Sequence, residues 1–254
     1  MAGLRPRDVP RHQPPGRALL LAPGGALTLQ VAVPPTSHGW PEVLGQEPAG
    51  RPRPAPRAVP ALPRAVDSRD LPAGCLGVTL ADDGTALSPL TVGPQSPGLL
   101  VVGGPGSGRS TALAALAQAL TEQGRTAVVV EHGAPLDEGT AATPDAVLLV
   151  DDAAAVPPAL EDALVRHAEA GGVVVAACGT ADAARAFRGL LAVLRDGRRA
   201  LVLGPAGPAE TDWLGIRIAV PAASLPGRGW LVDRGRASPL QVARPKLARG
   251  TLVR

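Results

Sequence analysis

Short apolar runs alternate with amphipathic stretches from residue 99 to residue 203. The apolar runs are four or five residues long and carry no charge, which is typical of strands buried on both faces of a sheet. They are Leu99–Val102, Ala127–Val130, Ala146–Val150, Val173–Ala177 and Ala200–Leu203. Helices are predicted at Ser110–Gln123, Pro158–Ala170 and Ala181–Arg195. The pattern therefore predicts an α/β fold in which helices flank a parallel sheet.

Three segments of the chain differ in composition. Residues 1–35 form a short unit, residues 36–70 are rich in proline and arginine, and residues 71–254 have a globular composition. The middle segment contains QEPAGRPRPAPRAVPALPRAV and predicts an extended linker, because it has too few apolar side chains for a packed core. Within the last segment, CLGVTLADDGTALSPLTV predicts two strands joined by a turn at residues 82–84.

An internal repeat relates the N-terminal segment to the end of the globular one. PGRALLLAPGGALTLQVAVP (residues 15–34) and PGRGWLVDRGRASPLQVARP (residues 226–245) are identical at 11 of 20 positions without a gap. Each copy predicts a β-hairpin with a glycine turn. The offset of 211 residues is about the length of a domain. We therefore interpret residues 1–35 as the closing hairpin of a preceding module of the same kind.

The strand at Leu99–Val102 runs into the glycine-rich stretch GGPGSGRST. This stretch fits the phosphate-loop pattern G-x-x-x-x-G-K-[ST] with arginine in place of the lysine. Glycines let backbone N–H groups turn toward a phosphate, and the N-terminus of the next helix favours negative charge. The predicted nucleotide-binding residues are Gly103, Gly104, Pro105, Gly106, Ser107, Gly108, Arg109, Ser110 and Thr111. The structural alternative is a plain turn whose helix is capped by Ser110.

Two carboxylates follow the apolar strand at Ala146–Val150. Because the carboxyl ends of parallel strands share one edge of a sheet, Asp151 and Asp152 are expected near the loop. Asp151 and the Ser110 hydroxyl are the predicted ligands of Mg²⁺, and Asp152 is the predicted acid that polarises the attacking water.

Two residues weaken this catalytic arrangement. Arg109 has a planar, forked guanidinium where a phosphate-loop lysine has a compact point charge. Arginine can still neutralise the phosphate charge, but it aligns the phosphates for hydrolysis less well. Asp152 is one methylene shorter than the glutamate that many ATPases carry there, and a misplacement of about 1 Å can cost about 10²-fold in rate. The sequence therefore predicts binding of ATP and Mg²⁺ with weak or absent hydrolysis, and Arg109 and Asp152 are the catalytic candidates.

Composition restricts the partners only loosely. The formal net charge is +3, and the chain has one lysine among many arginines, a bias that we attribute to genomic base composition. Charge alone therefore gives a weak argument for nucleic acid. Cys75 and Cys178 match no metal-ligand spacing and indicate a reducing compartment, and no apolar run in the sequence is long enough to span a membrane.

The loop GGPGSGRSTAL, the strand VLLVDD and the closing stretch LPGRGWLVDRGRASPLQVARP resemble the FtsK/SpoIIIE family of P-loop ATPases. Within that family they are similar to the C-terminal ATPase module of the EccC/EssC-like type VII secretion proteins of actinobacteria. The resemblance covers Leu71–Pro245, with Pro15–Pro34 as the end of a preceding module. Such proteins carry several ATPase modules in tandem, and each module ends in a hairpin of this kind.

The resemblance implies a RecA/FtsK-like fold with accessory hairpins. It also implies a phosphate loop at Gly103–Ser110, with Asp151 and Asp152 as the metal and hydrolysis acids. Later modules of such proteins are often degenerate and act by binding nucleotide, substrate or neighbouring modules. The implied setting is cytoplasmic, with a membrane complex reached through partner modules.

Two other functions stay open at this point. An active DNA translocase would carry lysine at position 109, glutamate at position 152 and a DNA-reading domain, and the sequence shows none of them. An unrelated P-loop enzyme is the second alternative, but the closing hairpin does not suit a kinase and the LSGGQ signature of transporters is absent from the sequence. DNA therefore stays open as a partner.

Other polar residues near the expected site have two interpretations each. Glu131 and His132 fit either substrate contact or simple solvation, and Thr180 fits either a sensor of the γ-phosphate or a helix cap. A basic cluster fits a neighbouring subunit, DNA or a solvated helix face; its members are Arg185, Arg188, Arg195, Arg198 and Arg199. Trp213 and Trp230 are predicted to belong to the core.

Overall fold

The structure is a computed structural model, and it describes residues 17–22, 25–30, 60–81, 84–93, 95–130, 145–218, 220 and 225–246. The chain forms two compact units, Met1–Pro56 and Arg57–Arg254. In its described residues the first unit is a hairpin of two antiparallel strands, β1 (Arg17–Ala22) and β2 (Gly25–Gln30).

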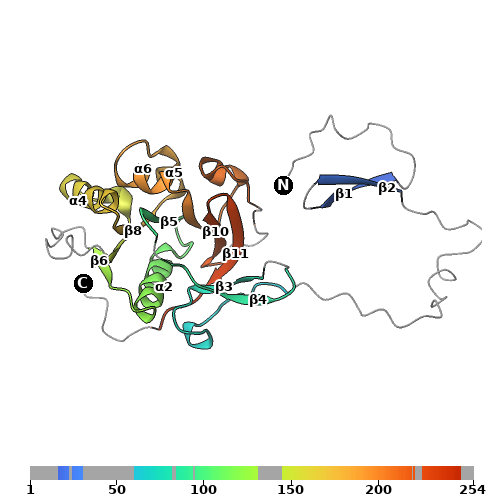
Figure 1. The fold of residues 1–254 in the computed structure, drawn as a ribbon, viewed down its shortest axis with the longest axis horizontal. Coiled ribbons are helices and arrows are strands. Elements are labelled where there is room, and N and C mark those ends of the chain that lie inside the picture. Colours follow the sequence, from blue (N-terminus) through green and yellow to red (C-terminus); the bar gives the residue numbers. More distant parts are fainter. Residues whose placement is uncertain are drawn as a thin grey trace, which may run out of the picture. The chain divides into compact units, whose positions relative to one another are not determined.

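A nine-stranded mixed sheet forms the second unit (Figure 1). Its parallel part has the strand order β9-β5-β8-β7-β6. These strands are β9 (Arg199–Leu203), β5 (Gly98–Gly103), β8 (Val173–Cys178), β7 (Val147–Val150) and β6 (Ala127–Val130). Each of the five predicted apolar runs is confirmed as one of these strands. The predicted α/β architecture, with a parallel sheet flanked by helices, is confirmed with them.

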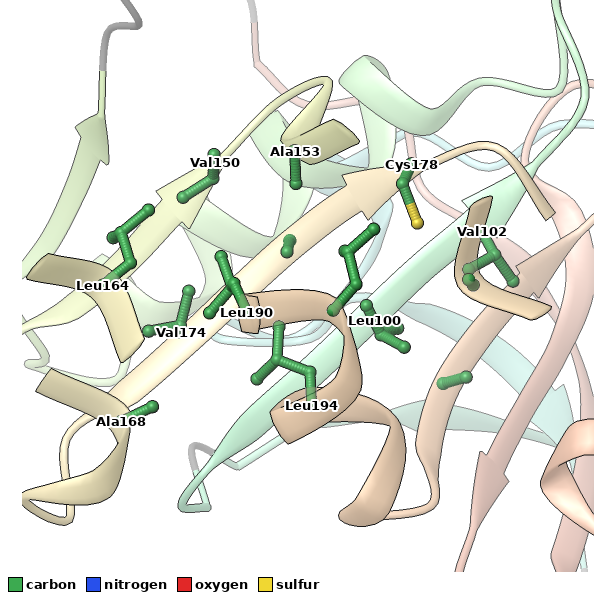
Figure 2. Close-up of a cluster of buried hydrophobic side chains, with 14 of the residues drawn as sticks. Leu100, Val102, Val150, Ala153, Leu164, Ala168, Val174, Cys178, Leu190 and Leu194 are labelled. Carbon is green, nitrogen blue, oxygen red and sulfur yellow. The ribbon is translucent and has the colours of Figure 1, made fainter. Parts of the chain in front are cut away.

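Side chains of the parallel strands alternate between two apolar cores. Leu99 and Val101 pack with the buried side of α2 (Arg109–Glu122). Leu100 and Val102 pack on the opposite face with α4 (Pro158–Glu169) and α6 (Gly189–Asp196), as Figure 2 shows. Because helices cover both faces, β5, β7, β8 and β9 are buried at every position, which explains their apolar runs. In the edge strand β6, Val129 is 60% exposed.

Four antiparallel strands continue the sheet beyond β9. They are β10 (Arg228–Asp233), β11 (Arg236–Val242), β3 (Gly77–Leu80) and β4 (Leu87–Leu90). β10 pairs with β9, and β11 pairs with β3. The two predicted hairpins of this unit are therefore part of the main sheet, which is mixed and has the predicted parallel core.

The two copies of the repeat have the same strand register. Arg17 lies opposite Gln30 in β1–β2, and Arg228 lies opposite Gln241 in β10–β11. Adding 211 to each residue number converts every pair of the first hairpin into a pair of the second. The prediction of two equivalent hairpins is confirmed, whereas the assignment of residues 1–35 to a preceding module stays a prediction.

One predicted helix is wrong in its extent. The segment Ala181–Arg195 forms two helices, α5 (Thr180–Arg185) and α6, with a break between them. Gly189 adopts a φ of +72°, and the carboxylate of Glu161 in α4 accepts the N–H of Leu190 at 3.0 Å. A side chain from another helix thus satisfies the start of α6, which the local pattern cannot show.

Residues 60–70 pack against the end of the sheet. Arg244 donates its N–H to Val66 O at 2.8 Å and accepts the N–H of Ser68 at 3.0 Å. A short 3-10 helix, η2 (Ser68–Asp70), follows. Two further 3-10 helices, η3 (Ala153–Ala155) and η4 (Pro208–Leu214), lie later in the chain. How far the linker of residues 36–70 extends stays a prediction. Among the described residues, no helix has the length and apolar content needed to cross a bilayer.

Candidate nucleotide-binding site

The loop between β5 and α2 exposes its backbone at the carboxyl edge of the parallel strands. Gly106 and Gly108 adopt φ values of +75° and +96°, a conformation that glycine takes without steric cost. A Cβ added to Gly104 or Gly106 would meet nothing within 4 Å. The backbone between Gly104 and Gly106 is therefore open on its outer side, as a phosphate-binding loop requires.

The base of the loop is packed tightly. A Cβ added to Gly103 would overlap with Ser107 Oγ and lie 2.7 Å from the carbonyl oxygen of Leu203 at the end of β9. Ser107 is 6% exposed, and its Oγ has no hydrogen-bond partner. A buried polar atom without a partner costs about 1–3 kcal/mol. The Ser107 hydroxyl is therefore an unsatisfied polar group at the base of the loop.

The helix α2 begins directly after this loop, with Gly108 as its N-cap residue. No side chain caps the helix, so the alternative in which Ser110 serves only as a cap is wrong. Ser110 and Thr111 lie exposed in the first turn. The free N–H groups of that turn and the helix dipole remain available to an anion.

Asp151 and Asp152 follow β7 at the same edge of the sheet. The N–H of Asp152 donates to Asp151 Oδ1 at 3.0 Å, and Asp152 takes a φ of +46°. This left-handed conformation is costly for an aspartate and turns the chain sharply after the strand. β8 lies between β5 and β7, so the two strand ends are about 10 Å apart. That distance leaves room for a phosphate group and its metal.

The end of β8 lies between the loop and the two carboxylates. The pKa of the Cys178 thiol is raised to about 12, mainly by burial and also by Asp182, while the Arg109 guanidinium acts to lower it. Asp152 also raises this pKa, so the charged groups of Asp182, Arg109 and Asp152 all lie near the end of β8. The thiol stays protonated and has no role as a nucleophile.

Thr180 follows this strand as the first residue of α5. Its Oγ1 is buried without a hydrogen-bond partner. Gly179 is the N-cap residue of α5 and no side chain caps the helix, so the cap interpretation of Thr180 is wrong. Thr180 is therefore the second unpartnered hydroxyl at this edge, after Ser107.

The predicted basic cluster does not form one face. Arg195 donates to the carbonyl oxygens of Ala184 and Ala186 at 3.1 and 2.9 Å, and its guanidinium lies 5.5 Å from the ring of Phe187. Arg199 is buried and forms an ion pair with Asp233, with 3.4 Å between Nε and Oδ1. These two arginines hold the fold together. The other three, Arg185, Arg188 and Arg198, are exposed.

Other sequence-based expectations have mixed outcomes. Trp213 and Trp230 pack against the core, as predicted. Glu131 and His132 lie outside the described residues. Sequence reasoning missed a contact between the loop and the closing hairpin, in which the Gly227 N–H donates to Ser107 O at 2.9 Å. The signal was present in the sequence, because Gly227 belongs to the repeated P-G-R motif.

The arrangement fits Mg²⁺ bound together with phosphate. In the described part of the chain, no three histidine, cysteine, aspartate or glutamate side chains group closely enough to hold a metal by themselves. Mg²⁺ is typically held by one or two protein oxygens plus substrate phosphates and water. Asp151 and Ser110 could supply those protein oxygens, and the open loop backbone could supply the phosphate contacts.

Solved structures match the chain, whereas no protein-family model and no curated protein matches its sequence. The cytoplasmic domain of the Thermomonospora curvata type VII secretion ATPase EccC has 17% identity and a TM-score of 0.51, covering 73% of this chain and 28% of that one. The cytoplasmic domain of EssC has 17% identity and a TM-score of 0.52, covering 96% and 61%.

A third similar structure contains ATPases 2 and 3 of Thermomonospora curvata EccC in complex with a signal sequence peptide. It has 18% identity and a TM-score of 0.52, covering 94% of this chain and 54% of that one. The chain thus spans less than two thirds of each of the three structures. The fold is that of a P-loop ATPase domain. The resemblance to EccC/EssC ATPase domains is confirmed as a likeness of fold.

Proposed function

We propose that this chain is an ATP-binding module of the FtsK/SpoIIIE type that binds MgATP weakly and hydrolyses it slowly or not at all. The observation that carries the proposal is the open loop between β5 and α2, with its unpartnered Ser107 hydroxyl, at the same sheet edge as Asp151. The loop backbone binds phosphate oxygens, and Ser110 and Asp151 hold the metal. When bound, Mg²⁺ neutralises phosphate charge and fixes the phosphate orientation.

Weak hydrolysis follows from the two substituted positions. Asp152 is exposed, and its backbone N–H is already used by Asp151. Its short side chain must reach a water molecule from a sharply turned backbone. Arg109 neutralises phosphate charge without the compact geometry of lysine. Binding therefore tolerates these substitutions better than the alignment that hydrolysis needs.

We further propose that the module works beside other ATPase modules in a cytoplasmic secretion or translocation assembly. The likeness of fold to tandem ATPase proteins and the repeated hairpin support this. The three exposed arginines, Arg185, Arg188 and Arg198, leave a contact with DNA or with a neighbouring subunit open to test.

Titration with MgATP tests the binding proposal by calorimetry and by thermal denaturation. Ligand at a hundred times its Kd stabilises a protein by about 2.7 kcal/mol. For a domain of this size, that corresponds to a rise in Tm of roughly 5–11 °C. If millimolar MgATP leaves the Tm unchanged and produces no heat, the nucleotide-binding proposal fails.

A matched pair of variants locates the metal contact. Ser110→Ala should weaken binding of MgATP while leaving the fold intact, because this hydroxyl is exposed in the first turn of α2. Thr121→Ala is the control, since that hydroxyl donates to Ala117 O at 2.9 Å at the other end of the same helix. Equal Kd values for the two variants would remove Ser110 from the site.

A further inference from the structure

A continuous series of hydrogen bonds connects residues 62 and 63 with the phosphate loop. Arg228 Nη2 donates to the carbonyl oxygens of Leu62 and Pro63 at 3.1 and 2.5 Å, and its Nε donates to Gln241 Oε1 at 2.9 Å. One guanidinium thus holds both the incoming segment and the facing strand. The planar fork of arginine suits such a three-way contact, whereas lysine offers only a point charge.

Gln241 carries the connection toward the loop. Its Nε2 donates to Pro226 O at 3.0 Å, and Gln241 is only 2% exposed. Gly227 then donates its N–H to Ser107 O at 2.9 Å and accepts the N–H of Val242 at the same distance. The series therefore runs from Leu62 and Pro63 through Arg228 and Gln241 to the carbonyl of Ser107.

The loop and the hairpin approach each other closely at this point. A Cβ added to Gly108 would lie 3.1 Å from Gly227 N, and Gly227 itself adopts a φ of +73°. A Cβ on Gly227 would lie 3.1 Å from Gln241 Nε2. Two backbones pack here without side chains between them, so a displacement of the hairpin moves the loop directly.

The repeated residues are the ones that make these contacts. Pro226, Gly227, Arg228 and Gln241 correspond to Pro15, Gly16, Arg17 and Gln30 in the first copy. The register keeps Arg17 opposite Gln30, as it keeps Arg228 opposite Gln241. A hairpin needs neither an arginine nor a glutamine to form, so its folding alone does not account for this pair.

We propose that Arg228 and Gln241 are positioning residues of the nucleotide site. Seated on Arg228, residues 62 and 63 fix the closing hairpin, and the hairpin fixes the phosphate loop at Ser107. Nucleotide affinity thereby depends on whether the incoming segment is seated. The effect on nucleotide affinity rests on the proposed nucleotide binding. The positioning of the loop by the hairpin does not need bound nucleotide.

Hydrogen exchange without nucleotide tests the structural part. In Arg228→Ala, exchange of the Gly227 amide should be about tenfold faster, because the hairpin is no longer held against the loop. Arg234→Ala is the matched control, since that arginine is exposed in the turn at the far end of the same hairpin. Equal exchange of Gly227 in the two variants would overturn the proposal.

Binding of MgATP tests the functional part. Arg228→Ala should raise the Kd about tenfold, with protection of the core amides of β8 unchanged. Arg228→Lys should recover only part of the affinity. Gln241→Met, which keeps the side-chain length and removes both hydrogen-bonding atoms, should behave like Arg228→Ala and replaces it if that variant does not fold.

The two parts of the test separate the two proposals. If the wild-type protein binds no MgATP, the proposed function fails, while the exchange of Gly227 still decides whether the hairpin positions the loop. If the wild type binds MgATP and Gly227 is loosened in Arg228→Ala without a change in Kd, Arg228 is structural only and the positioning role is wrong.

Discussion

Gly103→Ala should destabilise the domain, whereas Gly104→Ala next to it should not. The new methyl group at position 103 overlaps with Ser107 Oγ and lies 2.7 Å from Leu203 O, a backbone atom that moves only with β9. At Gly104 the same methyl group meets nothing within 4 Å. Neither glycine has a positive φ, so backbone strain does not separate the two variants.

The magnitude follows from two opposing effects. Overpacking of this kind costs about 1–3 kcal/mol. Replacing glycine by alanine also restricts the unfolded chain and stabilises by about 0.4–1 kcal/mol at both positions. We therefore expect a net loss of roughly 1–2 kcal/mol for Gly103→Ala, or about 2–8 °C in Tm. Gly104→Ala should melt at or slightly above the wild-type temperature.

Thermal and urea denaturation of the two variants measure this difference. The double variant Gly103→Ala with Ser107→Gly removes the overlapping side chain and should recover part of the loss, with Leu203 O still close. Equal melting temperatures for Gly103→Ala and Gly104→Ala would refute the packing of the loop base described here.

Further predictions concern catalysis and pH. Arg109→Lys combined with Asp152→Glu should raise steady-state ATP turnover above that of either single variant, and wild-type turnover near the enzyme median of about 10 s⁻¹ would show that the native pair is competent. The Gly74 N–H, followed by Gln118 and Lys246, lowers the pKa of Glu122. The ionised Glu122 carboxylate thus stabilises the fold above the ordinary carboxyl pKa of about 4.3. This stabilisation is lost as the pH falls through the lowered pKa of the folded state. The Tm difference between wild type and Glu122→Gln should shrink in acid, and a difference that stays constant from neutral pH to about pH 3 would contradict this.

The parts of the fold that depend on local pattern were predictable from the sequence. Each parallel strand contains the apolar run that predicted it, and β6 has the bounds Ala127–Val130 that its pattern predicts. The break between α5 and α6 was not predictable, because it depends on Glu161 reaching over from α4. That the hairpins join the main sheet was not predictable for a similar reason, because the pairing of β10 with β9 depends on which strand lies next to it and not on the pattern of either strand.

The site shows the same division. The glycines and the serine of the loop follow a motif whose chemistry is local, so the phosphate loop could be proposed from the sequence. The unpartnered hydroxyls of Ser107 and Thr180 are recognisable only once the surrounding atoms are placed. The contact of Arg228 with Pro63 joins residues 165 positions apart, and only the repeated P-G-R motif hinted at it.

The side-by-side packing of residues 66–68 and Arg244 has a mechanical consequence. Asp67 and Arg244 form a parallel bridge, and Arg244 also exchanges backbone hydrogen bonds with Val66 and Ser68. Because the two segments run parallel, tension applied between residues 60 and 246 loads these hydrogen bonds in shear, all at the same time. In the sheet, β10 separates the five parallel strands from β11 and from this bridge. A pull on residue 60 reaches residues 62 and 63 before this bridge, so their contact with Arg228 is loaded first and tension along the chain is passed to the closing hairpin beside the phosphate loop.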